Sequence, residues 1–75
     1  MIGKVLKYMR INKNLNQRQL GKILNISQQS LSRYEKNQRM ISFDLIEAIA
    51  NECGYKIYFE NDNEKFQAKD IERKI

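Results

Sequence analysis

The stretch that decides the fold is residues 15–35, which read LNQRQLGKILNISQQSLSRYE. It contains two positions at which a helix is expected to begin. Asn16 and Ser27 are residue types that cap helix N-termini, and each has an apolar neighbour directly before it and another four residues after it. Asn16 also has Gln19 three residues on, which completes a capping box. Because only residues 25–27 separate the two helices, the stretch predicts a helix-turn-helix.

Similar signals predict a helix on each side of this stretch. Ser42 repeats the cap, with Ile41 before it and Ile46 four residues later, and Gly54 is the residue type that commonly follows a helix end. An apolar stripe at helical spacing marks an earlier helix over about residues 2–12, formed by Ile2, Val5, Leu6 and Met9. The chain is therefore predicted to be mostly α-helical, with a four-helix domain over residues 1–54 and helices that begin near 2, 17, 28 and 43.

The remaining residues, 55–75, read differently. Tyr55, Ile57 and Phe59 alternate with polar residues, which predicts a short β-strand over 55–60 and a turn at 61–63. Residues 64–75 are polar, and both a frayed helix over about 67–75 and disorder are open.

A single strand does not persist without a partner. Residues 64–69 offer a poor second alternating run, so the favoured partner is the same strand of a second copy, antiparallel across a two-fold axis near Ile57. Tyr55, Ile57 and Phe59 are then the dimerisation residues. The rival is a dimer held by the final segment around Ile71 and Ile75.

Composition excludes several classes of function. The chain has 75 residues, one cysteine (Cys53) and no histidine, so it cannot form an internal disulfide, a Cys/His zinc site or a Ser-His pair. It has no glycine-rich phosphate loop. We therefore expect a non-enzyme with no metal and no cofactor. The absence of an apolar run longer than three residues predicts no membrane span, and the free cysteine favours the cytoplasm.

Charge is divided unevenly along the chain. Residues 1–40 contain nine Lys/Arg and one acid, Glu35, a net charge of +8, whereas residues 41–75 carry a net charge of −3. A basic half suggests a polyanionic partner, although a merely soluble surface would look the same.

The helix starts add a second indication of anion binding. The first turns that follow Asn16 and Ser27 contain no acid, whereas the turn after Ser42 contains Asp44. Helix N-termini carry a partial positive charge, so two neighbouring ends are left free for phosphate.

The helix that begins near residue 28 has a polar face opposite its apolar residues. That face carries residue types that bind base edges, because Gln pairs with adenine and Arg with guanine in the major groove. The candidate base-reading residues are Gln28, Gln29, Ser32 and Arg33. A solvated face is the alternative, and the short preceding turn and the basic surroundings favour base contact.

This stretch resembles the Cro/C1-type (XRE) helix-turn-helix family of phage repressors, and the resemblance covers residues 2–54. Five positions carry it, namely Arg10, Gln17, Leu20, Gly21 and Glu35. It implies a compact lambda-repressor-like bundle whose third helix enters the major groove. It also implies that Gln17 binds phosphate and braces Gln28, and that Arg10 pairs with Glu35, although a solvated Glu35 is the alternative. Gly21 matches the family's small residue at this position, although that residue is usually Ala. The chain also departs from the pattern at Asn25 and Asn37, where the family usually has Gly.

Several residues at the edges of the motif are candidate phosphate contacts. They lie at the two helix starts or just after the third helix, where the chain would meet the DNA backbone: Asn16, Gln17, Ser27, Lys36, Asn37 and Arg39. For the residues after the third helix, surface solubility is a competing explanation.

Three functions remain in competition. The leading hypothesis is a dimeric regulator that binds a palindromic or pseudo-palindromic site on double-stranded DNA. The second is the antitoxin of a toxin–antitoxin pair, which would bind its toxin through the C-terminal segment and its own operator through the helix-turn-helix. An enzyme accessory subunit is the third, and it would require the third helix to be inert.

Overall fold

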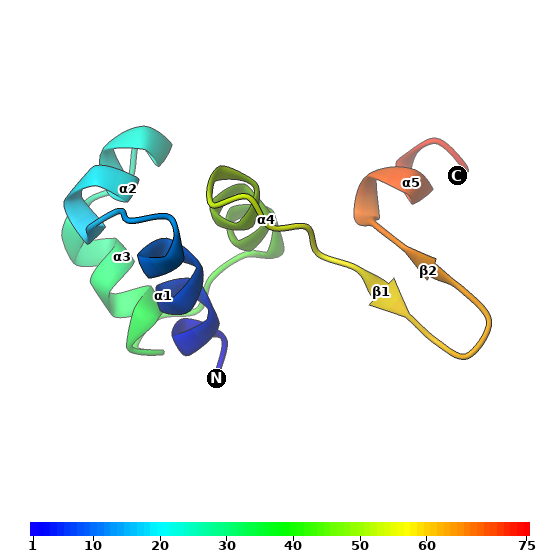
Figure 1. Ribbon diagram of the computed structural model, residues 1–75, viewed down its shortest axis with the longest axis horizontal. Helices are drawn as coiled ribbons and strands as arrows, with labels where there is room; N and C mark the ends of the chain where they lie inside the picture. The colour runs from blue at the N-terminus through cyan, green and yellow to red at the C-terminus, as the bar shows by residue number, and fades with distance from the viewer.

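The computed structural model describes all 75 residues as a four-helix bundle followed by a hairpin and a fifth helix (Figure 1). The elements are α1 (Ile2–Asn12), α2 (Gln17–Leu24), α3 (Gln28–Glu35), α4 (Phe43–Glu52), β1 (Phe59–Glu60), β2 (Lys65–Phe66) and α5 (Ala68–Glu72). The predicted fold class, a mostly helical bundle with a short C-terminal strand, is confirmed. No helix is both long and apolar enough to cross a membrane.

All three predicted N-caps are confirmed. The side chains of Asn16, Ser27 and Ser42 accept hydrogen bonds of 2.7–3.1 Å from the backbone N–H groups of Gln19, Ser30 and Leu45. The Gln19 side chain bonds back to the N–H of Asn16, which completes the predicted capping box. Each helix start is therefore determined locally, by residues within three positions of one another.

The turn between α2 and α3 depends on Asn25 and Gly21. Asn25 adopts the left-handed conformation, with φ of 58°, that the glycine usual at this position would adopt. The backbone N–H of Ile26 donates to the Gly21 carbonyl at 2.8 Å. A Cβ on Gly21 would lie 2.6 Å from the Ile26 carbonyl oxygen, so glycine allows the two segments to approach this closely.

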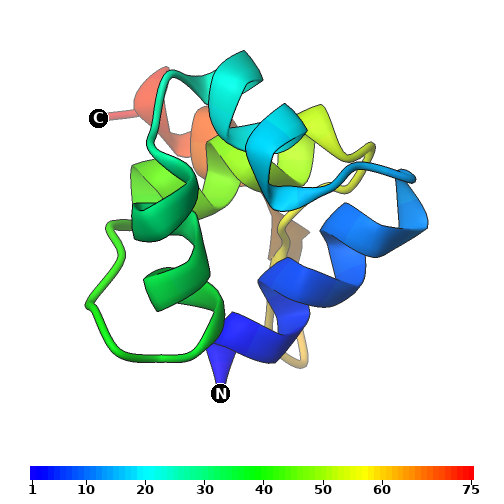
Figure 2. The ribbon, with the colours of Figure 1, turned by 90° about the vertical axis from the view of Figure 1, so that its left-hand side faces the viewer.

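The core lies between the four helices of the bundle (Figure 2). Helix α3 packs against α1 and α2, and α1 packs against α4. Each helix contributes at least one buried apolar residue to the cluster, which consists of Leu6, Met9, Leu20, Leu31, Ile49, Ala50 and Cys53. Burial raises the pKa of the Cys53 thiol, which lies in the core. Val5 differs from the expected apolar stripe, because its side chain remains exposed.

The C-terminal strand corrects the sequence prediction in length and in partner. The strand is only Phe59–Glu60, and it pairs antiparallel with Lys65–Phe66 of the same chain. The prediction that it pairs with a second copy instead of with residues 64–69 is therefore wrong. Tyr55 and Ile57 precede the strand and pack against the bundle core.

Local contacts explain why the hairpin closes within the chain. The Asn61 side chain accepts hydrogen bonds from the backbone N–H groups of Asn63 and Glu64, at 2.8 and 2.9 Å, and so holds the turn. The rings of Phe59 and Phe66 stack across the two strands, with centroids 5.6 Å apart. After the hairpin, α5 forms over part of the segment for which a frayed helix or disorder was open.

The molecule is elongated, with extents of 39 × 22 × 22 Å. Helices α2 and α3 lie at one end of the long axis, and β1, β2 and α5 lie at the other (Figure 1). The helix-turn-helix and the C-terminal segment are thus separated in space as well as in sequence.

A substitution at Gly3 tests the packing of α1 on α3. A Cβ there would lie 2.8 Å from the Tyr34 carbonyl oxygen and even closer to that of Glu35. Gly→Ala in a helix normally stabilises by about 1 kcal/mol, but we expect Gly3→Ala to cost roughly 1–3 kcal/mol because the backbones must separate. Urea unfolding followed by circular dichroism measures this, with the exposed Lys4→Ala as control. Equal or greater stability of Gly3→Ala would contradict the packing described here.

Candidate nucleic-acid interface

The outward face of α3 forms an open, wholly polar depression. Gln28, Gln29 and Arg33 are exposed there, and Ser32 is half-buried. The depression is lined by Gln17, Gln28, Gln29, Ser32, Arg33, Lys36 and Gln38. The structure therefore brings all four predicted base-reading residues together with two of the predicted phosphate contacts, and no acidic side chain lines the surface.

The N-termini of α2 and α3 border this surface without acidic neighbours. Neither helix has an acid in its first turn, whereas Asp44 lies in the first turn of α4. The positive ends of α2 and α3 are therefore not neutralised by their own side chains. Two such ends beside a polar face can bind phosphate on either side of a groove.

Some of the predicted phosphate contacts have side chains that already make hydrogen bonds within the protein, and others do not. Asn16 and Ser27 cap their helices, so their side-chain oxygens are occupied. Asn37 is left-handed, with φ of 58°, and its side-chain oxygen accepts the Gly3 N–H at 2.9 Å. Its side chain therefore ties the loop after α3 to the start of α1.

The two cations after α3 differ in the same way. Arg39 bonds the Ser30 hydroxyl at 3.2 Å and lies over the Tyr34 ring, 5.5 Å from its centroid. Lys36 makes no ion pair and lines the depression. Of these two, Lys36 is the one whose charge is placed on the polar face.

A buried ion pair joins α1 to the C-terminal end of α3. The Arg10 guanidinium donates to both carboxylate oxygens of Glu35, from Nε at 2.6 Å and from Nη2 at 2.9 Å. It also donates from Nη1 to the Leu15 carbonyl at 2.9 Å. Arg10 is 8% exposed and Glu35 is 7% exposed. The hydrogen bond to Glu35 raises the pKa of Arg10, against the opposing effect of burial.

Gln17 differs from what the resemblance implied. Its side-chain N–H donates to Glu35 Oε1 at 3.1 Å, so it joins the Arg10–Glu35 pair and makes no hydrogen bond to Gln28. Gln17 still lines the depression. The ion pair, the start of α2 and the end of α3 are therefore joined through one half-buried glutamine.

One residue of this surface was missed by sequence reasoning. Gln38 lines the depression, and its backbone N–H donates to the Arg33 carbonyl at 2.9 Å. The left-handed Asn37 turns the chain back and places Gln38 beside α3. An Asn in the place of a C-terminal glycine was the available signal, because such a residue reverses the chain.

Comparison with known proteins agrees with this geometry. The chain is 43% identical over 49 residues to antitoxin PezA of Streptococcus pneumoniae serotype 4 (strain ATCC BAA-334 / TIGR4), a match that covers 65% of this chain and 31% of that protein. The chain thus spans less than a third of the length of this relative. No solved structure matches. The helix-turn-helix family model matches residues 6–59, most of the chain, and the protein therefore belongs to the Cro/C1-type (XRE) helix-turn-helix family of DNA-binding regulators.

Proposed function

We propose that this protein is a sequence-specific transcriptional regulator that binds double-stranded DNA as a dimer, with α3 in the major groove. The observation that carries the proposal is the acid-free depression on α3, bordered by two helix N-termini whose first turns contain no acid. This surface belongs to the half of the chain with a net charge of +8. Phosphate attraction and base-edge contacts are thus available on one face.

The roles of the side chains follow from their chemistry. Gln28 and Gln29 read adenine, Arg33 reads guanine, and Ser32 contacts either type of base. Lys36, Gln17 and the N-termini of α2 and α3 bind phosphate and fix the register. Ser27 contributes by shaping the backbone that meets phosphate, since its hydroxyl already donates to Ser30 and accepts from the Ser30 N–H. Asn16 and Asn37 are bonded only through Oδ1, so their Nδ2 groups donate to phosphate.

A dimer is expected because a single helix-turn-helix reads few base pairs. Two copies related by a two-fold axis read two half-sites of a palindrome or pseudo-palindrome, and the spacing between their α3 helices sets the spacing of those sites. The dimer forms through the C-terminal part of the chain, which includes Tyr55, Ile57 and Phe59.

Alanine substitutions on α3 test the proposed readers. Selection from a random pool of duplexes defines the preferred site, and fluorescence anisotropy then compares Gln28→Ala, Gln29→Ala and Arg33→Ala on that site and on single-base variants. Each substitution should cost about 1–3 kcal/mol and relax the preference at one base pair per half-site. Asn51→Ala, at an exposed position of α4 outside the depression, is the control. If all three variants retain both affinity and preference, α3 is not the reader.

A second candidate function is supported by the relative that is named an antitoxin. In that case the C-terminal segment binds a toxin while α3 binds the operator. Coexpression with the protein encoded by the neighbouring gene distinguishes the two. A stable complex that retains DNA binding supports the antitoxin, whereas separate elution supports a regulator without a toxin partner.

A further inference from the structure

The last 17 residues form a projecting element with an uncovered apolar surface. This C-terminal arm, residues 59–75, consists of β1, β2 and α5, and it contains no buried residue. Phe59, Phe66, Ala68, Ile71 and Ile75 line one apolar depression on it. A hairpin of two short strands is marginally stable alone in water, so this arm needs a surface to pack against.

The bundle carries a second apolar surface, between α1 and α4. Eight of its nine lining residues are hydrophobic, among them Val5, Tyr8, Phe43 and Ile57. Tyr8 is 64% exposed, Val5 is 46% exposed and Phe43 is 38% exposed. The α1/α4 groove, as we call this surface, also includes Tyr55, so two of the three residues expected to mediate dimerisation line it.

The two apolar surfaces are continuous through three aromatic rings. Phe43 of the groove contacts Phe59 of the arm, with centroids 5.8 Å apart, and Phe59 stacks on Phe66. A protruding apolar arm and an exposed apolar groove on one chain form the two halves of a self-complementary interface. In a two-fold dimer each contact then occurs twice.

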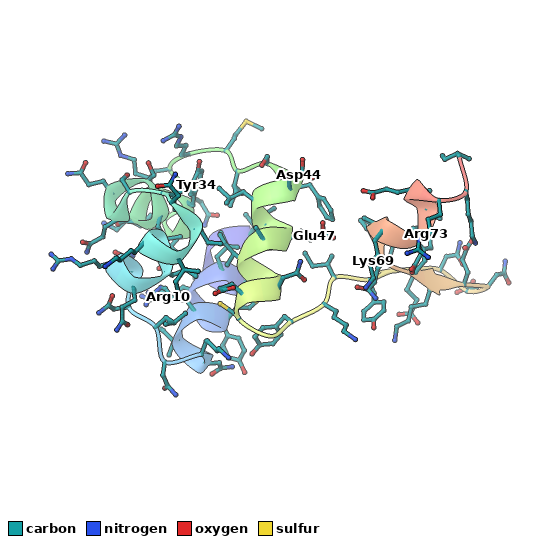
Figure 3. All side chains as sticks on the ribbon, turned by 90° about the horizontal axis from the view of Figure 1, so that it is seen from above. Arg10, Tyr34, Asp44, Glu47, Lys69 and Arg73 are labelled. Atoms are coloured by element: carbon teal, nitrogen blue, oxygen red, sulfur yellow. The ribbon has the colours of Figure 1, made fainter.

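The charges beside these surfaces are acidic on α4 and mixed on the arm, where Asp70 and Glu72 accompany cations. Helix α4 has three acids and no base, and Asp44 and Glu47 lie on its side that faces the arm (Figure 3). Lys69 of α5 and Arg73, the residue that caps the C-terminus of α5, lie in the arm four residues apart, so they project from the same side of it. The Arg10–Glu35 pair is the only salt bridge within the chain, so all four of these charges remain available to a partner.

We propose that the α1/α4 groove receives the C-terminal arm of a second copy of this chain, with Lys69 and Arg73 of each copy beside Asp44 and Glu47 of the other. The inference deepens the proposed function, since it rests on the dimer named there. It also agrees with the overall shape, because the arm and α3 lie at opposite ends of the molecule (Figure 1). A dimer formed through the arms leaves both α3 helices free for DNA.

Sedimentation of the full chain tests the apolar contact. We expect wild type to be a dimer, and Ile71→Asp to weaken dimerisation about thirtyfold or more, as loss of a central apolar anchor does. Ile23→Asp is the matched control, an exposed isoleucine at the α2 end of the molecule. A monomeric wild type, or an Ile71→Asp variant as dimeric as Ile23→Asp, overturns the proposal.

A charge exchange tests the orientation without relying on arm stability. Asp44→Lys with Glu47→Lys should weaken the dimer about tenfold, because four cations then meet at each contact. Adding Lys69→Glu and Arg73→Glu should restore it. If the fourfold variant is no tighter than the double variant, these charges do not meet across the interface.

Failure of the dimer and failure of the proposed function give different results. If the arm does not form the dimer contact but the protein is a DNA-binding regulator, Ile71→Asp binds the selected DNA with wild-type affinity and stays dimeric. If the function is wrong, wild type dimerises but shows no sequence preference on DNA. If wild type dimerises and binds DNA cooperatively, and Ile71→Asp does neither, the result supports both the arm contact and the proposed function.

Discussion

Replacing Arg10 with Met is expected to lower the unfolding free energy by about 3–5 kcal/mol, because the Glu35 carboxylate then remains buried without its cation. For a domain of this length the whole stability is roughly 4–11 kcal/mol, so the variant should lose a large share of it. Urea unfolding followed by circular dichroism gives the number. Arg18→Met, an exposed arginine on α2, is the control and should change stability by less than about 0.5 kcal/mol.

A double variant distinguishes the loss of the Arg10–Glu35 attraction from the cost of burying an unpaired Glu35 carboxylate. Arg10→Met with Glu35→Leu removes both charges and keeps apolar volume in place, so it should recover most of the stability that Arg10→Met loses. Gln17 then loses its partner but is only half-buried and can turn to water. A double variant as unstable as the sum of the two single losses would show that the pair contributes net stability of its own.

The same pair should give little pH dependence in the neutral range. The pKa of Arg10 is raised in the folded state, so the stability it contributes is fully present below the unfolded-state pKa. That contribution is lost only as the pH rises through the folded-state value, at strongly alkaline pH. Between mild acid and mild base the guanidinium remains charged in both states.

The sequence predicted the parts of this fold that depend on local chemistry. The caps at Asn16, Ser27 and Ser42 each involve a side chain and a backbone N–H three residues away, so spacing alone was sufficient. The face of α3 was also predictable, because helical periodicity decides which residues lie opposite Leu31. The Arg10–Glu35 pair came from the family resemblance, and the structure confirms it.

The parts that could not be predicted depend on contacts between distant or weakly patterned segments. Nothing in the local sequence around Gln17 indicates that its amide would bind Glu35, since their proximity depends on how α2 and α3 cross. The hairpin was missed because two-residue strands are too short for alternation to be seen. Its stability depends on one Asn61 turn and one Phe59–Phe66 contact.

Salt should weaken DNA binding steeply, and Lys36 should account for a measurable share of the effect. Each phosphate neutralised contributes a slope of about −0.9 in log K against log salt. If a dimer makes 6–10 such contacts, affinity falls by roughly 10³–10⁵ between 50 and 200 mM salt. Lys36 makes no ion pair and lines the depression on α3. Lys36→Ala should therefore weaken binding to every sequence alike and reduce the slope by about 0.9 per protomer.

Arg39 provides the sharpest comparison, since it follows the same helix and carries the same charge. Its guanidinium bonds Ser30 and lies over Tyr34, so it must leave these partners before it can neutralise a phosphate. Arg39→Ala should therefore flatten the slope less than Lys36→Ala does, and Asn51→Ala, at an exposed position of α4, should not change it. Fluorescence anisotropy on the selected duplex over a series of salt concentrations gives all four slopes. A wild-type affinity independent of salt would exclude phosphate binding by this face, and a larger change for Arg39→Ala would show that Arg39 turns outward when DNA binds.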